Sequence, residues 1–146
     1  NRGLRNDGKL GAWDKENYPY YKRDVENITS GLNKASLPKD TIVYRGFGHG
    51  AGKSTSQEMM KSLQIGSIYK DKGFISTSVD KNIANQMGFS VVAEIKLKKG
   101  SKVALLNNKL NFMGEQEVLV QRGSSFKITG KRQEGNITII QMENIL

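Results

Sequence analysis

The sequence predicts an α+β domain in which helices precede strands, and two features of residue spacing lead to this prediction. The first is a helical period near the N-terminus, where residues with apolar surface recur at intervals of three and four: Tyr21, Val25, Ile28, Leu32 and Ala35. The second is a change after Asp80, where short runs rich in β-branched residues alternate with Gly, Asn and Lys turns. A length of 146 residues suits one domain with a single hydrophobic core, so we expect residues 1–146 to form one unit.

The expected elements follow one another along the chain. Residues 1–13 are rich in Gly, Asn and Arg, lack a clear period, and are expected to be an arm or linker. A helix begins near Pro19, which suits a first helical turn, and ends before Pro38. A second helix is expected to end near Leu63. A further short helix is expected near 83–87, and strands at 41–45, 91–97, 103–106, 118–121, 126–129 and 137–142.

Composition narrows the possible chemistry. The chain has no cysteine and one histidine, His49, so a disulfide framework is excluded and a metal site is not expected. The net charge of +9, from 23 basic and 14 acidic residues, indicates either an anionic partner or a solubilising surface. No apolar run approaches about 20 residues, the length of a membrane span, and we expect no membrane partner. Because the chain starts at Asn1 and has no signal peptide, we expect a piece of a longer protein that could include a delivery or structural domain.

A glycine-rich loop at 46–52 resembles two nucleotide-binding signatures. A P-loop requires glycine where this chain has Phe47. The dinucleotide fingerprint requires a following βαβ unit, which the element order lacks. We therefore interpret the loop as a connection that leaves the first strand.

Two short segments carry residues suited to binding a polar ligand. Arg45 and Gly46 end the first strand, where a guanidinium can pair with phosphate oxygens and a glycine lets a ligand approach the backbone. In extended backbone, Ser76 and Ser78 share one face and could line a polar cleft. Taken singly, these segments are also compatible with a solvated arginine and a polar strand facing water.

A pair of glutamates directly precedes the strand expected at 118–121. Glu115 and Glu117 are two residues apart, so both carboxylates project from one face of an extended backbone. One anion could then lie beside a reacting sugar and the other beside an acceptor. A charged edge strand that guards against aggregation is the alternative interpretation.

Taken together, these segments resemble the arginine–serine–glutamate branch of the mono-ADP-ribosyltransferases, which includes Rho-modifying exoenzymes and actin-modifying binary toxins. The family pattern is an aromatic-Arg-Gly strand, then aromatic-x-Ser-Thr-Ser, then Gly-Glu/Gln-x-Glu-Val-Leu. This chain has all three in that order, at 44–46, 74–78 and 114–119. The resemblance implies an α+β fold with N-terminal helices followed by two packed, mostly antiparallel β-sheets that form an NAD cleft.

The resemblance also implies the residues of the site. Glu117 would be the catalytic carboxylate beside the nicotinamide ribose, Ser76 would orient it, and Arg45 would hold the phosphates of NAD. Further NAD-binding residues would be Gly46, Ser76, Thr77, Ser78 and Phe89. Phe89 lies later than the family pattern leads one to expect and could instead begin the following strand.

The acceptor side of the reaction is implied in the same way. Glu115 completes the Glu-x-Glu form, which in this family goes with arginine acceptors, and would be the second catalytic carboxylate. Phe112 matches an aromatic residue that contacts the target protein, although it could equally anchor the core. The implied activity transfers ADP-ribose from NAD to an arginine of actin or another host protein, with release of nicotinamide and without a metal. Such a protein would be a bacterial or phage toxin, secreted or delivered into a target cell.

Other functions stay open from the sequence. An enzyme of the same fold could only hydrolyse NAD, with water as the acceptor. A basic nucleic-acid-binding module would explain the charge of +9 but not the glutamate pair, and no recognised signature supports it, so we do not expect a nucleic-acid partner. Four aromatic residues could either pack in the core or line the adenine side of the cleft: Trp13, Tyr18, Tyr20 and Tyr21.

Overall fold

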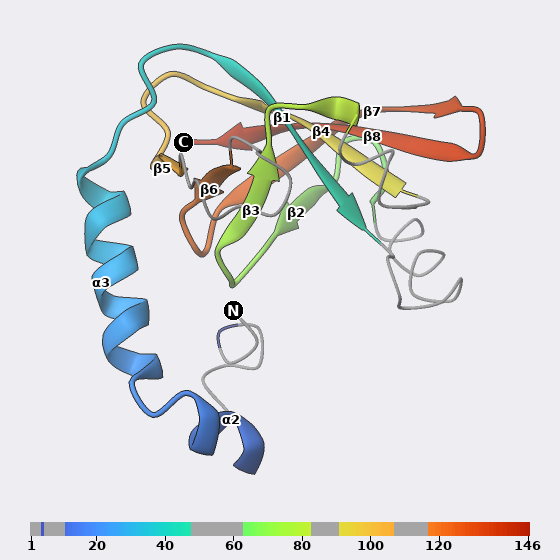
Figure 1. Cartoon of the computed structure of the whole chain (residues 1–146). Coiled ribbons are helices and arrows are strands. Elements are labelled where there is room, and N and C mark those ends of the chain that lie inside the picture. The colour runs from blue at the N-terminus through green and yellow to red at the C-terminus, as the bar shows by residue number, and fades with distance from the viewer. Residues whose placement is uncertain (1–3, 5–10, 48–62, 83–90, 107–116) are drawn as a thin grey trace.

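The computed structural model describes residues 4, 11–47, 63–82, 91–106 and 117–146. Helices α2 (Ala12–Asn17) and α3 (Tyr21–Lys34) precede the strands, and Figure 1 shows α3 along one side of them with α2 beyond its N-terminal end. The strands are β1 (Thr41–Phe47), β2 (Ile68–Lys70), β3 (Ile75–Ser78), β4 (Val91–Leu97), β5 (Val103–Leu106), β6 (Glu117–Val120), β7 (Ser125–Glu134) and β8 (Ile137–Ile145). The predicted α+β class, with helices first and strands later, is confirmed.

The eight strands form one hydrogen-bonded sheet in the order β2-β7-β8-β4-β1-β3-β6-β5. Neighbouring strands are antiparallel except for the parallel pair β4 and β8. β1 pairs with β4 along its whole length, but with β3 only where Tyr44 lies opposite Ser78. The two sheets implied by the resemblance are therefore two halves of one mostly antiparallel sheet, joined at this pair.

A main cluster of buried apolar side chains contains residues of both halves. The larger half contributes, among others, Val43, Ile95, Phe126, Ile128 and Ile140, and the smaller half contributes Ile75, Val118 and Val120. These are largely the β-branched residues whose alternation predicted the strands, because every second side chain of a strand points to the same face. Burial of this face against the other half explains why the strand predictions succeeded.

α2 and β2 were not predicted from the sequence, and β3 was considered only as extended backbone at the serine motif. Residues 1–13 were expected to be an arm, yet α2 begins at Ala12, and six residues are too few to show a helical period. β2 has only three residues and is held by pairing with β7, with Tyr69 opposite Phe126. The Tyr69 ring contacts both Phe47 and Phe126. These tertiary aromatic contacts stabilise β2, although its own three residues show no strand pattern.

The remaining element predictions differ in length or lie outside the described residues. β4 and β5 coincide with the predicted ranges. β7 and β8 are longer than the predicted strands at 126–129 and 137–142, because both continue into more polar residues. The helix predicted to end near Leu63 and the short helix predicted at 83–87 lie wholly or almost wholly outside the described residues. Among the described helices, none combines the length and apolar character needed to cross a membrane.

Side chains from the β6–β7 turn hold α3 against the sheet. Gln121 Nε2 donates to the Thr29 carbonyl and to Asn33 Oδ1, both at 2.9 Å. Arg122 Nε donates to Thr29 Oγ1 at 2.8 Å. Burial raises the pKa of the Tyr21 hydroxyl at the other end of α3, and the charge of Arg122 opposes this shift. Leu32 is the one buried side chain of α3, so these hydrogen bonds add to a small apolar contact.

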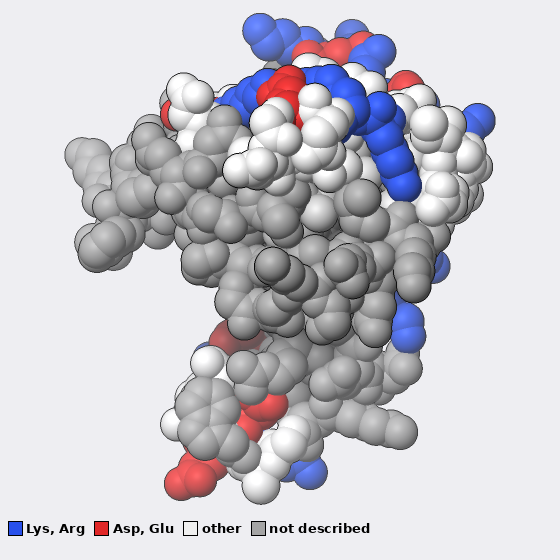
Figure 2. All heavy atoms as spheres, turned by 90° about the vertical axis from the view of Figure 1, so that its right-hand side faces the viewer, with Lys and Arg blue, Asp and Glu red and all other residues white. Residues whose placement is uncertain are grey.

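An ion-pair network lies on the outer face of the larger half, opposite the main core. Arg132 contacts Glu94 at 2.8 Å and Glu134 at 3.0 Å, and Lys81 contacts Glu134 at 3.0 Å. Figure 2, seen from the side towards which the β7–β8 hairpin points, shows basic and acidic side chains next to each other in its upper part. The hydrogen bond from Arg132 lowers the pKa of Glu94, although partial burial opposes this effect.

Replacing Glu94 by Gln should make the stability less dependent on pH in acid. Because the pKa of Glu94 is lowered in the folded state, its carboxylate contributes stability that is present above the unfolded value, 4.5, and is lost as the pH falls through the folded value. Urea midpoints measured from about pH 7 to about pH 3 should therefore fall more steeply for the wild type than for Glu94→Gln. Glu26→Gln, at an exposed position of α3, is the matched control and should keep the wild-type slope. Equal slopes for the wild type and Glu94→Gln would contradict this assignment.

Candidate active site

The pairing of β3 with β6 brings a serine and a glutamate together. Ser76 lies opposite Leu119 and Ser78 lies opposite Glu117, so Ser76 and Glu117 are diagonal neighbours on one face of the sheet. The Ser76 hydroxyl donates a hydrogen bond to Glu117 Oε1 at 2.5 Å. Ser76 is exposed and Glu117 is half-buried, so the carboxylate is both oriented by the protein and accessible to a ligand.

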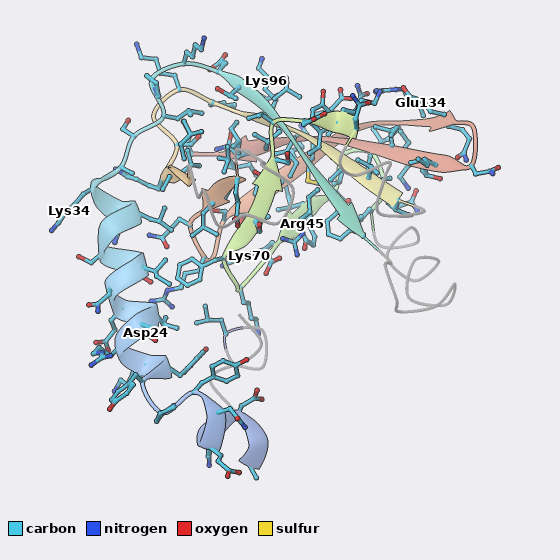
Figure 3. All side chains as sticks on the ribbon, viewed as in Figure 1. Asp24, Lys34, Arg45, Lys70, Lys96 and Glu134 are labelled. Carbon is cyan, nitrogen blue, oxygen red and sulfur yellow. The ribbon has the colours of Figure 1, made fainter. Side chains whose placement is uncertain are left out.

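Arg45 reaches the same place from β1. Its Nη1 donates a hydrogen bond to the Ser76 carbonyl at 3.2 Å. Figure 3 labels Arg45 beside β3. The guanidinium carbon lies 5.5 Å from the centroid of the Phe47 ring, at the distance of a cation–π contact. A cation, a hydroxyl and a carboxylate from three strands thus meet through two hydrogen bonds.

The next two hydroxyls of β3 are engaged within the protein. Thr77 is buried, and its Oγ1 donates to the Val118 carbonyl at 2.7 Å, which fixes the register of β3 against β6. Ser78 is also buried, and its Oγ accepts a hydrogen bond from the Asp80 N–H at 3.0 Å. The sequence led us to expect Ser76 and Ser78 side by side in a polar cleft. Ser78 differs because it is flanked by Tyr44 of β1 as well as by β6.

The structure describes some of the other residues implied by the resemblance but not all of them. Gly46 is half-buried in β1 opposite Val92. Glu115, Phe112 and Phe89 lie outside the described residues, so their proximity to the site stays a prediction. Among the described residues, no group of three or more His, Asp or Glu side chains could hold a metal ion.

A hollow of about 310 Å³ adjoins the serine–glutamate pair, and the sequence did not reveal it. Its lining residues are Tyr18, Tyr21, Asp24, Val25, Ile28, Phe74 and Leu119. Leu119 lies opposite Ser76 and is two residues from Glu117 on the same face of β6, and Phe74 directly precedes β3, two residues before Ser76. This spacing is a signal that could have indicated an apolar wall beside the site. Tyr20 is not part of this lining, and its ring instead lies under Arg23, whose guanidinium carbon is 4.3 Å from the ring centroid.

Comparison with known proteins shows to which class this arrangement belongs. The model of the ADP-ribosyltransferase exoenzyme family matches residues 1–146. The chain therefore belongs to the ADP-ribosyltransferase exoenzyme family, and the resemblance found in its three motifs is confirmed.

Individual relatives agree with this family. The mono(ADP-ribosyl)transferase SpvB of Salmonella typhimurium (strain 14028s / SGSC 2262) is 32% identical over 105 residues, which are 71% of this chain and 17% of SpvB. Plx2a, an ADP-ribosyltransferase toxin from Paenibacillus larvae, has a similar fold with a TM-score of 0.78 at 22% identity, over 100% of this chain and 78% of that chain. The ADP-ribosylating toxin BECa of C. perfringens, solved with NADH, has a TM-score of 0.70 at 26% identity, over 99% of this chain and 39% of that chain. This chain thus spans less than a fifth of the length of SpvB.

Proposed function

We propose that this chain is the catalytic domain of a mono-ADP-ribosyltransferase that uses NAD and modifies a target protein. The observation that carries the proposal is the hydrogen bond from Ser76 to Glu117 beside the guanidinium of Arg45. This arrangement unites the three motifs of the sequence in one place. Membership of the ADP-ribosyltransferase exoenzyme family and the similarity to a toxin solved with NADH support it.

The reaction breaks the bond between C1′ of the nicotinamide ribose and the pyridine nitrogen. The bonding electron pair leaves with nicotinamide, so positive charge develops on the ribose. The carboxylate of Glu117, held in place by Ser76, stabilises that charge more in the transition state than in the bound substrate. A nitrogen of the acceptor then forms the new bond to C1′ and loses a proton.

The remaining NAD contacts are assigned by chemistry. Arg45 would pair with the phosphates, since a guanidinium matches phosphate oxygens in a bidentate manner. The backbone at Gly46 and the side chain of Phe89 would contact the nicotinamide end. Thr77 and Ser78 would act through the backbone of β3, because their hydroxyls are bonded to Val118 and Asp80.

The acceptor is proposed to be an arginine of a target protein. Glu115 would pair with the acceptor guanidinium and position its nitrogen, which is otherwise a poor nucleophile at neutral pH. Phe112 would contact the surface of the target. The proposed protein is a toxin that acts on a host protein such as actin after secretion or delivery into a cell. The name of Plx2a, an ADP-ribosyltransferase toxin, supports the toxin part of this proposal.

Labelling with isotopic NAD tests the proposal. The chain should release nicotinamide and transfer label to a protein of a host-cell lysate, and mass spectrometry should find the adduct on arginine. Glu115→Gln should abolish protein labelling but retain much of the NAD cleavage. An adduct on another side chain would overturn the arginine assignment, and cleavage without any labelling would favour an NAD glycohydrolase.

Replacing Ser76 by Ala should lower the rate of NAD cleavage about 10- to 100-fold, because the variant removes a hydrogen-bond donor to a charged group. The effect should appear in kcat, measured as nicotinamide release at saturating NAD, since Glu117 would remain present but unoriented. Ser76→Thr, which keeps the hydroxyl, should restore part of the rate.

Ser124→Ala is the matched control for Ser76→Ala, because Ser124 lies in the β6–β7 turn and donates to the Gln121 carbonyl. It should leave kcat unchanged. Equal rates for the wild type and Ser76→Ala would show that the hydroxyl does not orient the carboxylate.

A further inference from the structure

Two turns come together at the end of the sheet where β1 begins and β4 ends. The Leu37 N–H donates to the Ser101 carbonyl at 3.0 Å, and the Gly100 N–H donates to the Leu37 carbonyl at 2.8 Å. Asp40 Oδ1 accepts from the Lys99 N–H at 2.8 Å. These contacts join the α3–β1 connection to the β4–β5 turn.

This junction gathers exposed lysines from distant parts of the sequence. We call them the lysine end: Lys34, Lys39, Lys96, Lys99 and Lys102. Lys34 and Lys39 lie close to Leu37 in sequence, and Lys99 and Lys102 lie close to Ser101, so the bonded turns bring both pairs together. Figure 3 labels Lys34 at the end of α3 and Lys96 on β4.

The positive charge of the lysine end is not neutralised within the described residues. None of its five side chains has an ion-pair partner among those residues. Two carboxylates lie nearby: Asp40 is bonded to the Lys99 backbone, and Glu143 contacts Lys98 at 3.4 Å. The surface therefore carries a clear excess of positive charge, in contrast to the balanced network around Arg132.

The chemistry of this surface favours a lipid headgroup layer over a nucleic acid. All five cations are lysines, which act as flexible point charges, whereas base and phosphate recognition commonly uses the planar fork of arginine. Residues 34–42 and 96–102 contain no aromatic side chain on which a base could stack. Ile42, which is 42% exposed, lies opposite Lys96, and Ile145 at the same end is 47% exposed. Exposed aliphatic side chains among lysines suit the boundary between headgroups and acyl chains.

We propose that the lysine end is a docking surface for an anionic phospholipid bilayer. From the sequence we expected no membrane partner, because we considered runs able to span a bilayer. Peripheral attachment to an anionic bilayer instead requires positive charge gathered on one surface. The fold creates such a surface from segments that are separate in the sequence. Arg45 lies towards the other end of β1, opposite Ala93, whereas Thr41 lies opposite Leu97. Docking therefore leaves the candidate active site free for a protein substrate.

Vesicle flotation tests this inference with the 146-residue chain. The chain should bind vesicles of phosphatidylcholine containing roughly 30% phosphatidylserine, should bind pure phosphatidylcholine much more weakly, and should dissociate as salt is raised. The triple variant Lys39→Gln/Lys99→Gln/Lys102→Gln should bind the anionic vesicles about a hundredfold more weakly, since each lysine near such a surface contributes about fivefold. Its melting temperature should stay close to that of the wild type, because all three side chains are exposed.

The matched control removes the same charge elsewhere. Lys15→Gln/Lys22→Gln/Lys70→Gln changes three exposed lysines on α2, α3 and β2 and should keep vesicle binding within about twofold of the wild type. An equal loss in both triple variants would show that net charge alone causes binding and would overturn the proposal. Binding independent of phosphatidylserine would also overturn it, as would a variant that loses affinity for a DNA or RNA duplex while vesicle binding is unchanged. None of these outcomes depends on NAD turnover, so this inference and the proposed activity can fail separately.

Discussion

Replacing Glu117 by Gln is expected to lower the rate of NAD cleavage about 10²- to 10³-fold. The amide occupies nearly the same volume but has no negative charge to stabilise the ribose cation. Ser76 can still donate to the amide oxygen, so the strand pair and the fold should be retained. The measurement is nicotinamide release at saturating NAD, with circular dichroism and thermal unfolding as checks of structure.

A carboxylate far from the site provides the control for Glu117→Gln. Glu16 is exposed on α2, and Glu16→Gln should cleave NAD at the wild-type rate. The affinity of Glu117→Gln for NAD should change much less than its rate, because the charge that Glu117 stabilises develops in the transition state. Wild-type turnover by Glu117→Gln would remove the basis of the proposed mechanism.

Replacing Arg45 by Lys should raise KM for NAD about 10- to 100-fold, because lysine keeps the charge but loses the planar fork that pairs with phosphate. A smaller fall in kcat should accompany this change. Arg45 Nη1 also donates to the Ser76 carbonyl, so its loss loosens the strand that presents Ser76. Initial rates over a range of NAD concentrations separate the two effects.

Arg23→Lys is the matched control for Arg45→Lys, since Arg23 is an exposed arginine of α3 that stacks on Tyr20. It should leave both KM and kcat unchanged. If Arg45→Lys altered kcat alone, Arg45 would be a brace for β3 and not a phosphate ligand.

The elements that sequence predicted well are those whose own side chains are buried. β4 turns Val91, Ala93, Ile95 and Leu97 into the main core and buries Val92 on its other face, and its range was predicted correctly. α3 was predicted from its apolar spacing, although Leu32 is the one buried side chain among its residues. In contrast, Tyr69 holds β2 against two phenylalanines from other strands. Such a contact cannot be predicted from the residue pattern of β2 itself.

The residues of the candidate site were also predicted from the sequence, whereas their contacts depend on the tertiary structure. The motifs identified Arg45, Ser76 and Glu117 as suitable groups, and their order along the chain indicated the family. Their contact depends on β3 lying between β1 and β6, with a register that makes Ser76 and Glu117 diagonal neighbours. A shift of one residue in that register would turn one side chain to the opposite face of the sheet. The buried bond from Thr77 to the Val118 carbonyl stabilises the observed register.

By itself, the sequence determined the α+β class, the principal strands, the family and the chemical groups available for catalysis, because residue type and periodicity are properties of neighbouring positions. Only the tertiary structure decided which groups meet. It joined the two sheet halves at Tyr44 and Ser78, buried Ser78 while exposing Ser76, and brought together the separate segments that carry the lysine end. The physical reason is that hydrogen bonds and charge interactions act over a few ångströms in space, and their partners here lie about 30 to 90 residues apart in the chain.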